Sequence, residues 1–116
     1  MKNALREVMI AAEGAGELTG EGIGEGDAEH PICGDRIRVY CRVADGVIDD
    51  LSWKASGCPA TMAVAAASPL ALFGVPVDEA PERLHRRLQS LGGLGAHEGH
   101  AEKLFLEALT RALGAG

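Results

Sequence analysis

Cysteine, aspartate and histidine side chains that could bind a metal ion stand at three separate places in this chain of 116 residues. Cys33 and Asp35 flank Gly34, which lets the backbone turn tightly enough for a thiol and a carboxylate to converge. Cys58 directly precedes Pro59, a residue suited to the first position of a helix. A cysteine at a helix N-terminus is favoured as thiolate, which is the form that binds metals.

A third place is the start of the last predicted helix. His97 and His100 lie three residues apart there, so both rings can face one point. Together with Cys33, Asp35 and Cys58, they offer a ligand set suited to zinc or iron. A thiol enzyme with Cys58 as nucleophile and His97 as base is the alternative from another class. Because no motif supplies an oxyanion hole or a substrate pocket, we do not expect an enzyme.

The remaining cysteine and histidines are predicted to have ordinary structural roles. Cys41 follows the apolar alternation of a strand and is assigned to the core. His30 and His85 are expected to be solvated or locally hydrogen-bonded, His85 on an exposed helix face between arginines.

The composition excludes several classes of protein. A net charge of −6 and an aromatic content of 3% argue against a nucleic-acid binder. No run approaches the roughly 18 apolar residues of a membrane helix. Three cysteines, an odd number, argue against a disulfide framework and favour a reducing, cytoplasmic setting. The length predicts one domain over residues 1–116.

The first part of the chain is predicted to be a short amphipathic helix, residues 3–12, and then a Gly/Glu-rich segment. That segment, about residues 13–29, combines glycines with six acidic residues. We expect it to be extended and flexible, with at most one edge strand. Its acidic side chains are solvated in this interpretation, and a docking surface for a basic partner is the alternative.

Residues 36–55 show the clearest secondary structure, a β-hairpin. Apolar and polar residues alternate along 36–43, with Ile37, Val39, Cys41 and Val43 on the dry face and Arg36, Arg38, Tyr40 and Arg42 on the wet face. Asp45-Gly46 is a strong type I′ turn signal, and residues 47–55 form the return strand.

Three helical regions follow the hairpin. The alanine-rich run 60–67 indicates a buried helix. Pro69 either interrupts this helix or starts a second one. Asp78 is the predicted N-cap of a helix over 79–91. The last helix is predicted from about His97 to Leu113, with His97 on its inner side.

Three motifs together resemble a known family. They are His-Pro-Ile-Cys-Gly-Asp-Arg-Ile at 30–37, Ala-Asp-Gly-Val-Ile at 44–48 and Ser-Gly-Cys-Pro-Ala at 56–60. From about residue 13 onward the chain resembles the iron–sulfur cluster assembly scaffolds of the IscU and NifU N-terminal type. This resemblance implies an α+β fold, a small antiparallel sheet of about three strands covered on one face by helices. It also implies a cluster or zinc site built from three cysteines and an aspartate.

Carried over by position, Cys33 and Cys58 match the first two family cysteines and Asp35 the aspartate. Aligning Ala101-Glu102 with the family's Ala-Glu puts His97 at the third cysteine position, and His100 follows it. The resemblance thus implies iron or a [2Fe–2S] cluster held by Cys33, Asp35, Cys58 and His97, with His100 nearby as a further metal ligand. Cysteine desulfurase and cluster-accepting proteins are the implied partners. The alternative is a zinc-binding structural or regulatory paralogue that no longer assembles clusters.

Overall fold

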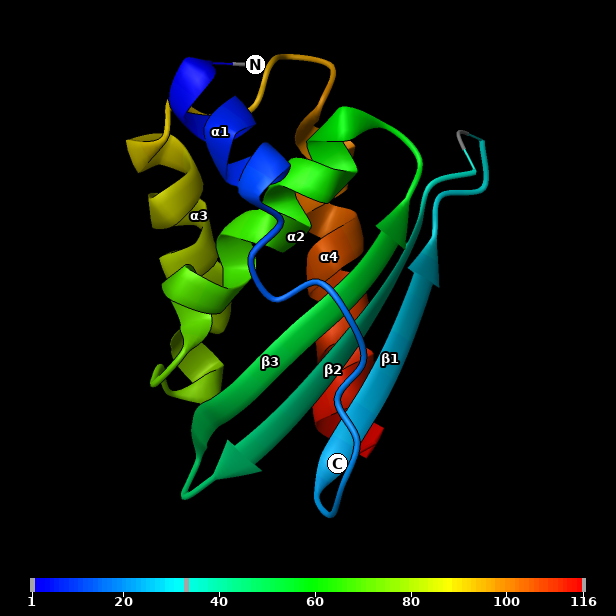
Figure 1. Ribbon diagram of the computed structural model, residues 1–116, viewed down its shortest axis with the longest axis vertical. Helices are drawn as coiled ribbons and strands as arrows, with labels where there is room; N and C mark the ends of the chain where they lie inside the picture. The colour runs from blue at the N-terminus through cyan, green and yellow to red at the C-terminus, as the bar shows by residue number, and fades with distance from the viewer. Residues whose placement is uncertain (1, 33, 116) are drawn as a thin grey trace.

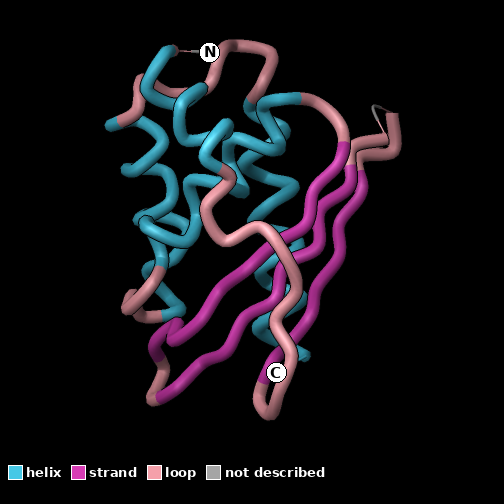
Figure 2. The backbone as a smooth tube through the Cα atoms, viewed as in Figure 1, coloured by secondary structure: helices cyan, strands magenta, loops and turns pink. Residues whose placement is uncertain are grey.

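A β-hairpin forms the centre of the fold, as the alternation along residues 36–43 predicted. The computed structural model describes residues 2–32 and 34–115 (Figures 1 and 2). Strands β2 (Arg36–Ala44) and β3 (Val47–Ser56) pair antiparallel. Asp45 and Gly46 have φ angles of 53° and 76°, so both central residues of the turn are left-handed. This is the type I′ geometry that the Asp-Gly signal predicted.

The Gly/Glu-rich segment supplies the third strand. Strand β1 (Ile23–Glu29) pairs antiparallel with β2, which gives the sheet order β1-β2-β3. β1 is therefore the one edge strand that the sequence analysis allowed within this segment. Its buried positions are Gly24, Gly26 and Ala28, which are small enough for a helix to pack closely on them.

The helices lie against the sheet and against one another. Their bounds are α1 (Asn3–Ala11), α2 (Pro59–Leu72), the 3₁₀ helix η1 (Val77–Glu79), α3 (Ala80–Ser90) and α4 (Gly99–Ala115). α4 packs on β1 and β2, α2 packs on β3, and α1 and α3 contact α2. Figure 1 shows α4 behind the three strands. The expected α+β class, three antiparallel strands with helices on one face, is confirmed. Within residues 2–32 and 34–115, no helix combines the length and apolar character needed to span a membrane.

Helix α2 continues through Pro69, so the expected interruption is wrong. A proline in a helix interior removes the bond to the carbonyl four residues earlier, here that of Ala65. The hydroxyl of Ser68 donates to this Ala65 oxygen at 2.6 Å and satisfies it. Ser68 is fully buried, so the replacement bond lies within the core.

Two other local expectations are also corrected. Asp78 lies within η1 and is not the N-cap of α3, which begins two residues later. Val43 was assigned to the dry face but is 41% exposed, because the register of β2 and β3 shifts between Arg42 and Val43. An irregularity of this kind turns the following side chains away from the regular alternation.

Residues 13–22 cross the sheet on the side opposite α4 (Figure 1). Trp53 in β3 anchors this segment: its indole Nε1 donates to Glu13 O at 2.7 Å, and its main chain exchanges bonds with Gly14 and Gly16. Tyr40 was predicted to be exposed to solvent, but only 1% of the residue is exposed. Tyr40 lies in the central strand, paired with Glu25 of β1 on one side and Ser52 of β3 on the other, and alternation within one strand does not show that it is flanked on both sides.

A first prediction concerns the contact between β1 and α4. A Cβ added at Gly26 would lie 2.1 Å from Ala108 O and 2.4 Å from Ala112 N, so Gly26→Ala must push the helix away. We expect the free energy of unfolding in urea to fall by about 2 kcal/mol or more. Gly114→Ala on α4 is the control, because nothing lies within 4 Å of its added Cβ. Equal stability of the two variants would contradict this account of the contact.

Candidate metal centre

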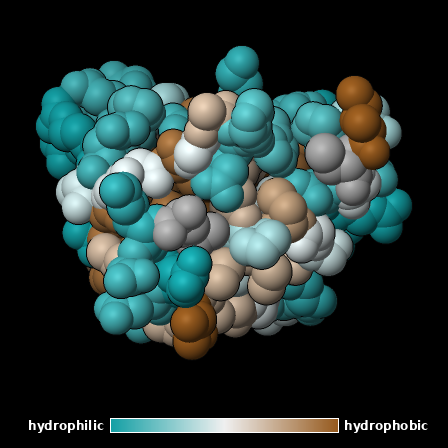
Figure 3. Space-filling view, turned by 90° about the horizontal axis from the view of Figure 1, so that it is seen from above, coloured by the Kyte–Doolittle hydropathy of each residue, from teal (hydrophilic) through white to brown (hydrophobic). Residues whose placement is uncertain are grey.

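Three junctions of the fold meet at the end of the sheet opposite the hairpin turn. They are the β1–β2 loop with Asp35, the β3–α2 junction with Cys58, and the first turn of α4 with His100. All three lie at the top of Figure 1, and Figure 3 looks down on this end, where hydrophilic surface surrounds a few separate apolar side chains. Antiparallel pairing of β1 with β2 and of β2 with β3 brings the first two junctions to the same end of the sheet.

The carboxylate of Asp35 is buried at the centre of this arrangement, with 2% of the residue exposed. Its Oδ1 accepts the main-chain N–H of Cys58 at 2.9 Å. Its Oδ2 accepts the thiol of Cys58 and the hydroxyl of Thr61, each at 3.0 Å. Burial alone would raise the pKa of Asp35, but these donors and His100 outweigh it and hold that pKa below its ordinary value.

Cys58 is the N-cap of α2, as predicted, and Pro59 opens the helix. The preceding Gly57 has a φ of 126°, a conformation that residues with a side chain rarely adopt. A Cβ at Gly57 would also lie 2.2 Å from Asp35 Oδ1. Glycine is therefore required here by both the backbone angle and the space that the carboxylate occupies.

His100 is the third potential ligand of this group. Its Nε2 lies 3.7 Å from Cys58 Sγ and 3.4 Å from Asp35 Oδ2, and its side chain is 26% exposed. The ring of His30 packs against it edge to face, with centroids 5.1 Å apart. Potential ligand atoms of Asp35, Cys58 and His100 all lie within 4.8 Å of one another, the one such group of three among the described residues.

The structure does not bring His97 into this group. Helix α4 begins at Gly99, two residues later than predicted, because residues 95–98 close a turn of their own. Glu98 N donates to Gly95 O at 3.0 Å, and its carboxylate accepts Gly95 N at 2.7 Å. His97 is exposed in that turn, whereas His100 lies in the first turn of the helix and reaches the site.

The other predicted residues fall as follows. Cys33 lies outside the described residues. Cys41 is 2% exposed in the core, and burial with the nearby Asp50 charge raises the pKa of its thiol to about 11. The imidazole of His85 pairs with Glu102 on the surface at 3.0 Å. Cys41 and His85 therefore have the structural roles that the sequence predicted.

Sequence reasoning missed two residues of the site, Thr61 and His30. Thr61 is fully buried one turn into α2, and its position three residues after the N-cap was the available signal. His30 was expected to be solvated or locally hydrogen-bonded, and its Nδ1 does accept the nearby N–H of Ile32, but its contact with His100 was not predicted. Its position two residues beyond buried Ala28 could have indicated that it faces the helices.

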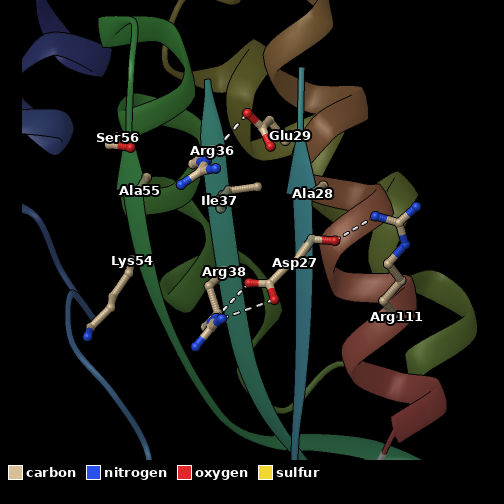
Figure 4. Close-up of a pocket in the computed structure, with 10 residues that line it drawn as sticks. All are labelled: Asp27, Ala28, Glu29, Arg36, Ile37, Arg38, Lys54, Ala55, Ser56 and Arg111. Atoms are coloured by element: carbon tan, nitrogen blue, oxygen red, sulfur yellow. Dashed lines mark hydrogen bonds and ion pairs between the residues drawn. The ribbon is translucent and has the colours of Figure 1, made fainter. Parts of the chain in front are cut away.

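A groove with a volume of about 610 Å³ lies elsewhere, on the outer face of the sheet. Figure 4 shows its charged side chains pairing with one another: Arg38 with Asp27, and Arg36 with Glu29 at 3.4 Å. Arg111 of α4 also donates to the main-chain oxygen of Asp27. The charges that line this groove are therefore paired within the chain.

The pattern of the NifU-like N-terminal domain family matches residues 5–115. The chain belongs to this family. Two relatives from Archaeoglobus fulgidus, named iron–sulfur cluster assembly scaffold proteins IscU 1 and IscU 2, are each 31% identical over 91 residues. The matched part is 78% of this chain and 60% of each relative, so the chain spans less than two thirds of their length.

Solved structures show the same fold. The N-terminal part of a nitrogen-fixing NifU-like protein from Brucella abortus superposes with a TM-score of 0.64 at 21% identity, over 97% of this chain and 78% of that one. A candidate scaffold protein for the SUF system of Fervidobacterium islandicum has a TM-score of 0.65 at 17% identity, over 99% and 95%. At 21% and 17% sequence identity, these two comparisons show that the chains share a fold and nothing further.

In this NifU-like domain the three donor types fit one metal ion. A thiolate, a carboxylate and an imidazole are all ligands of zinc and of iron. The same side chains lie within hydrogen-bond distance of one another. Metal binding would displace the thiol proton, because cysteine binds metals as thiolate.

A second prediction tests whether the position of the Asp35 carboxylate requires glycine at residue 57. Gly57→Ala should lower the free energy of unfolding by roughly 3 kcal/mol, from backbone strain plus displacement of the carboxylate. Gly34→Ala, also at a positive φ of 73° but with nothing within 4 Å of the added Cβ, should lose only about 1–2 kcal/mol. Urea unfolding of both variants measures the difference. A loss at Gly57 no larger than that at Gly34 would show that the carboxylate yields without cost.

Proposed function

We propose that this NifU-like domain holds iron or a [2Fe–2S] cluster as cargo during iron–sulfur cluster assembly. The observation that carries the proposal is the convergence of a thiol, a carboxylate and an imidazole within 4.8 Å at one end of the sheet. The family to which the chain belongs and the names of the two Archaeoglobus relatives support it. In this proposal the protein carries its cargo and does not catalyse a reaction.

The proposed ligands are Cys33, Asp35, Cys58 and His100. Cys33 enters by its place in the sequence, two residues before Asp35 in the motif that resembles the family's first cysteine. His100 takes the role first assigned to His97, because its Nε2 faces both Cys58 Sγ and Asp35 Oδ2. Mixed sulfur and nitrogen ligation would raise the reduction potential of a cluster above that of an all-cysteine site.

Zinc is the second candidate, and one observation favours it. The third ligand position holds an imidazole, which cannot carry sulfur as a persulfide, whereas tetrahedral zinc accepts thiolate, imidazole and carboxylate together. In that case the protein would be a zinc-binding paralogue with a structural or regulatory role.

A cysteine desulfurase as sulfur donor and apoproteins as cluster acceptors are the proposed partners, in keeping with the family. A cytoplasmic setting goes with them, because a reducing compartment keeps the thiols of Cys33 and Cys58 free to bind metal.

The deciding experiment is the metal and acid-labile sulfide content of the protein purified without oxygen. Iron and sulfide in equal amounts, with a visible absorption spectrum typical of a [2Fe–2S] cluster, would support cluster transport. Stoichiometric zinc without sulfide, unchanged after incubation with iron, a desulfurase and cysteine, would favour the paralogue. A protein that takes up neither metal would contradict both candidates.

A third prediction separates the ligand cysteine from the packing cysteine. Cys58→Ala should keep the fold and lose the bound metal, because Sγ is one of the converging ligand atoms. Cys41→Val should keep both, at a cost under about 1.5 kcal/mol, because valine is a close volume match in the core. Metal per chain and the urea midpoint of each variant are the measurements. Loss of metal from a folded Cys41→Val variant would reverse the assignment.

A fourth prediction distinguishes the two histidines of the last loop and helix. His100→Ala should weaken zinc binding at least about 10-fold, the scale of the loss seen even for groups that only support a ligand. His97→Ala should leave affinity unchanged, because this residue lies exposed in the preceding turn. Competition with a chromophoric chelator measures both constants. The opposite order of effects would restore His97 as the ligand.

A further inference from the structure

His30 lies in the site without belonging to its group of ligand atoms. It directly follows β1, and its main-chain N–H donates to Asp35 O at 2.8 Å. This bond continues the β1–β2 ladder by one step beyond the pair Glu29 and Arg36. Since Ala28 and Ile37, two steps back, are a buried cross-strand pair, the alternation of side chains places His30 and Asp35 on that same face.

The ring of His30 meets α4 from this position. Its centroid lies 5.1 Å from that of His100, and the two ring planes form an angle of 63°. Edge-to-face contact at this distance is a favourable arrangement of aromatic rings. The contact limits how the His100 ring can turn, and that ring's Nε2 is the atom directed at Cys58 and Asp35.

The nitrogens of His30 are not part of the group of converging ligand atoms, which among the described residues belongs to Asp35, Cys58 and His100. Its Nδ1 accepts the main-chain N–H of Ile32 at 3.3 Å. The contact that His30 makes with His100 is the edge-to-face contact of its ring.

We propose that His30 is a positioning residue, whose ring fixes the orientation of the His100 imidazole toward a metal ion bound with Cys58 and Asp35. This inference rests on the proposed function, because it requires His100 to be a ligand. Groups that orient a metal ligand typically contribute 10-fold to 100-fold to metal affinity.

Two variants separate the ring from the hydrogen bond. His30→Phe keeps a flat ring against His100 but cannot accept the N–H of Ile32. His30→Asn keeps an acceptor that can reach this N–H but has no ring. The test uses the full chain with Co²⁺ alone as probe, its ligand-field spectrum reporting the geometry and chelator competition reporting the affinity.

We expect His30→Phe to stay within about 3-fold of the parent affinity with an unchanged spectrum. We expect His30→Asn to bind Co²⁺ about 10-fold more weakly, with shifted ligand-field bands and an unchanged melting temperature. Equal losses in both variants, or a loss in His30→Phe alone, would overturn the proposal, because the imidazole nitrogen and not the ring would then be required. Parent-like binding by His30→Asn would also overturn it.

His100→Ala, measured in parallel, separates this inference from the proposed function. A loss of Co²⁺ affinity in His100→Ala with none in His30→Asn removes only the role of His30. Unchanged binding by His100→Ala removes His100 as a ligand, and with it both the proposed ligand set and the role of His30.

Discussion

The hydrogen-bonded carboxylate of Asp35 is the interaction on which the geometry of this end of the molecule depends. It joins three elements that are distant in the sequence. Asp35 leads into β2, its Oδ1 accepts the main-chain N–H of Cys58 at the N-cap of α2, and its Oδ2 is bonded by Thr61 of α2 and His100 of α4. A buried charge left without such partners would cost several kcal/mol. The sheet end and the two helix starts therefore have to meet if the carboxylate is to stay ionised.

The same network explains how a metal site can be preorganised. The thiol of Cys58, the hydroxyl of Thr61 and the imidazole of His100 all lie within hydrogen-bond distance of one oxygen, Asp35 Oδ2. A cation that replaced the thiol proton would meet ligand atoms already within a few ångströms of one another, so little conformational entropy remains to be lost. Thr61 has no need to move in this exchange, and its hydroxyl would remain as support for the bound carboxylate.

Much of this architecture could be predicted from local sequence patterns. The period of two along residues 36–43 and the Asp-Gly turn gave the hairpin, and Pro59 gave the start of α2, because these signals act over a few residues. The continuation of α2 past Pro69 could not be predicted so easily, since it depends on a side-chain bond from Ser68 within a buried helix. The burial of Tyr40 goes with its place in the central strand, between Glu25 and Ser52, which the pairing of three separate segments creates.

Of the predicted ligands, Asp35, Cys58 and His100 lie together in the structure, whereas His97 does not join them. The convergence of Asp35 and Cys58 could be predicted, because the sequence carries signals for both the strand pairing and the helix N-cap that produce it. The choice between His97 and His100 depends on whether α4 begins at residue 97 or 99, and such boundaries shift by a residue or two with the turn that precedes them. The place of His30 beside His100 could not be predicted, because the glycines of β1 obscure the alternation that would have shown which face it occupies.

Gly26 has a consequence for the order in which the fold forms. β1 has glycines at two of its buried positions, so it has few side-chain contacts of its own and depends on α4, roughly 80 residues later, to cover it. The hairpin and α2 can form from neighbouring residues, whereas β1 gains its full set of contacts only after α4 has been synthesised and has docked. His30 directly follows β1, and His100 lies in the first turn of α4. In the proposed function, the imidazole side of the centre therefore depends on this long-range contact, and local opening there would release a bound ion.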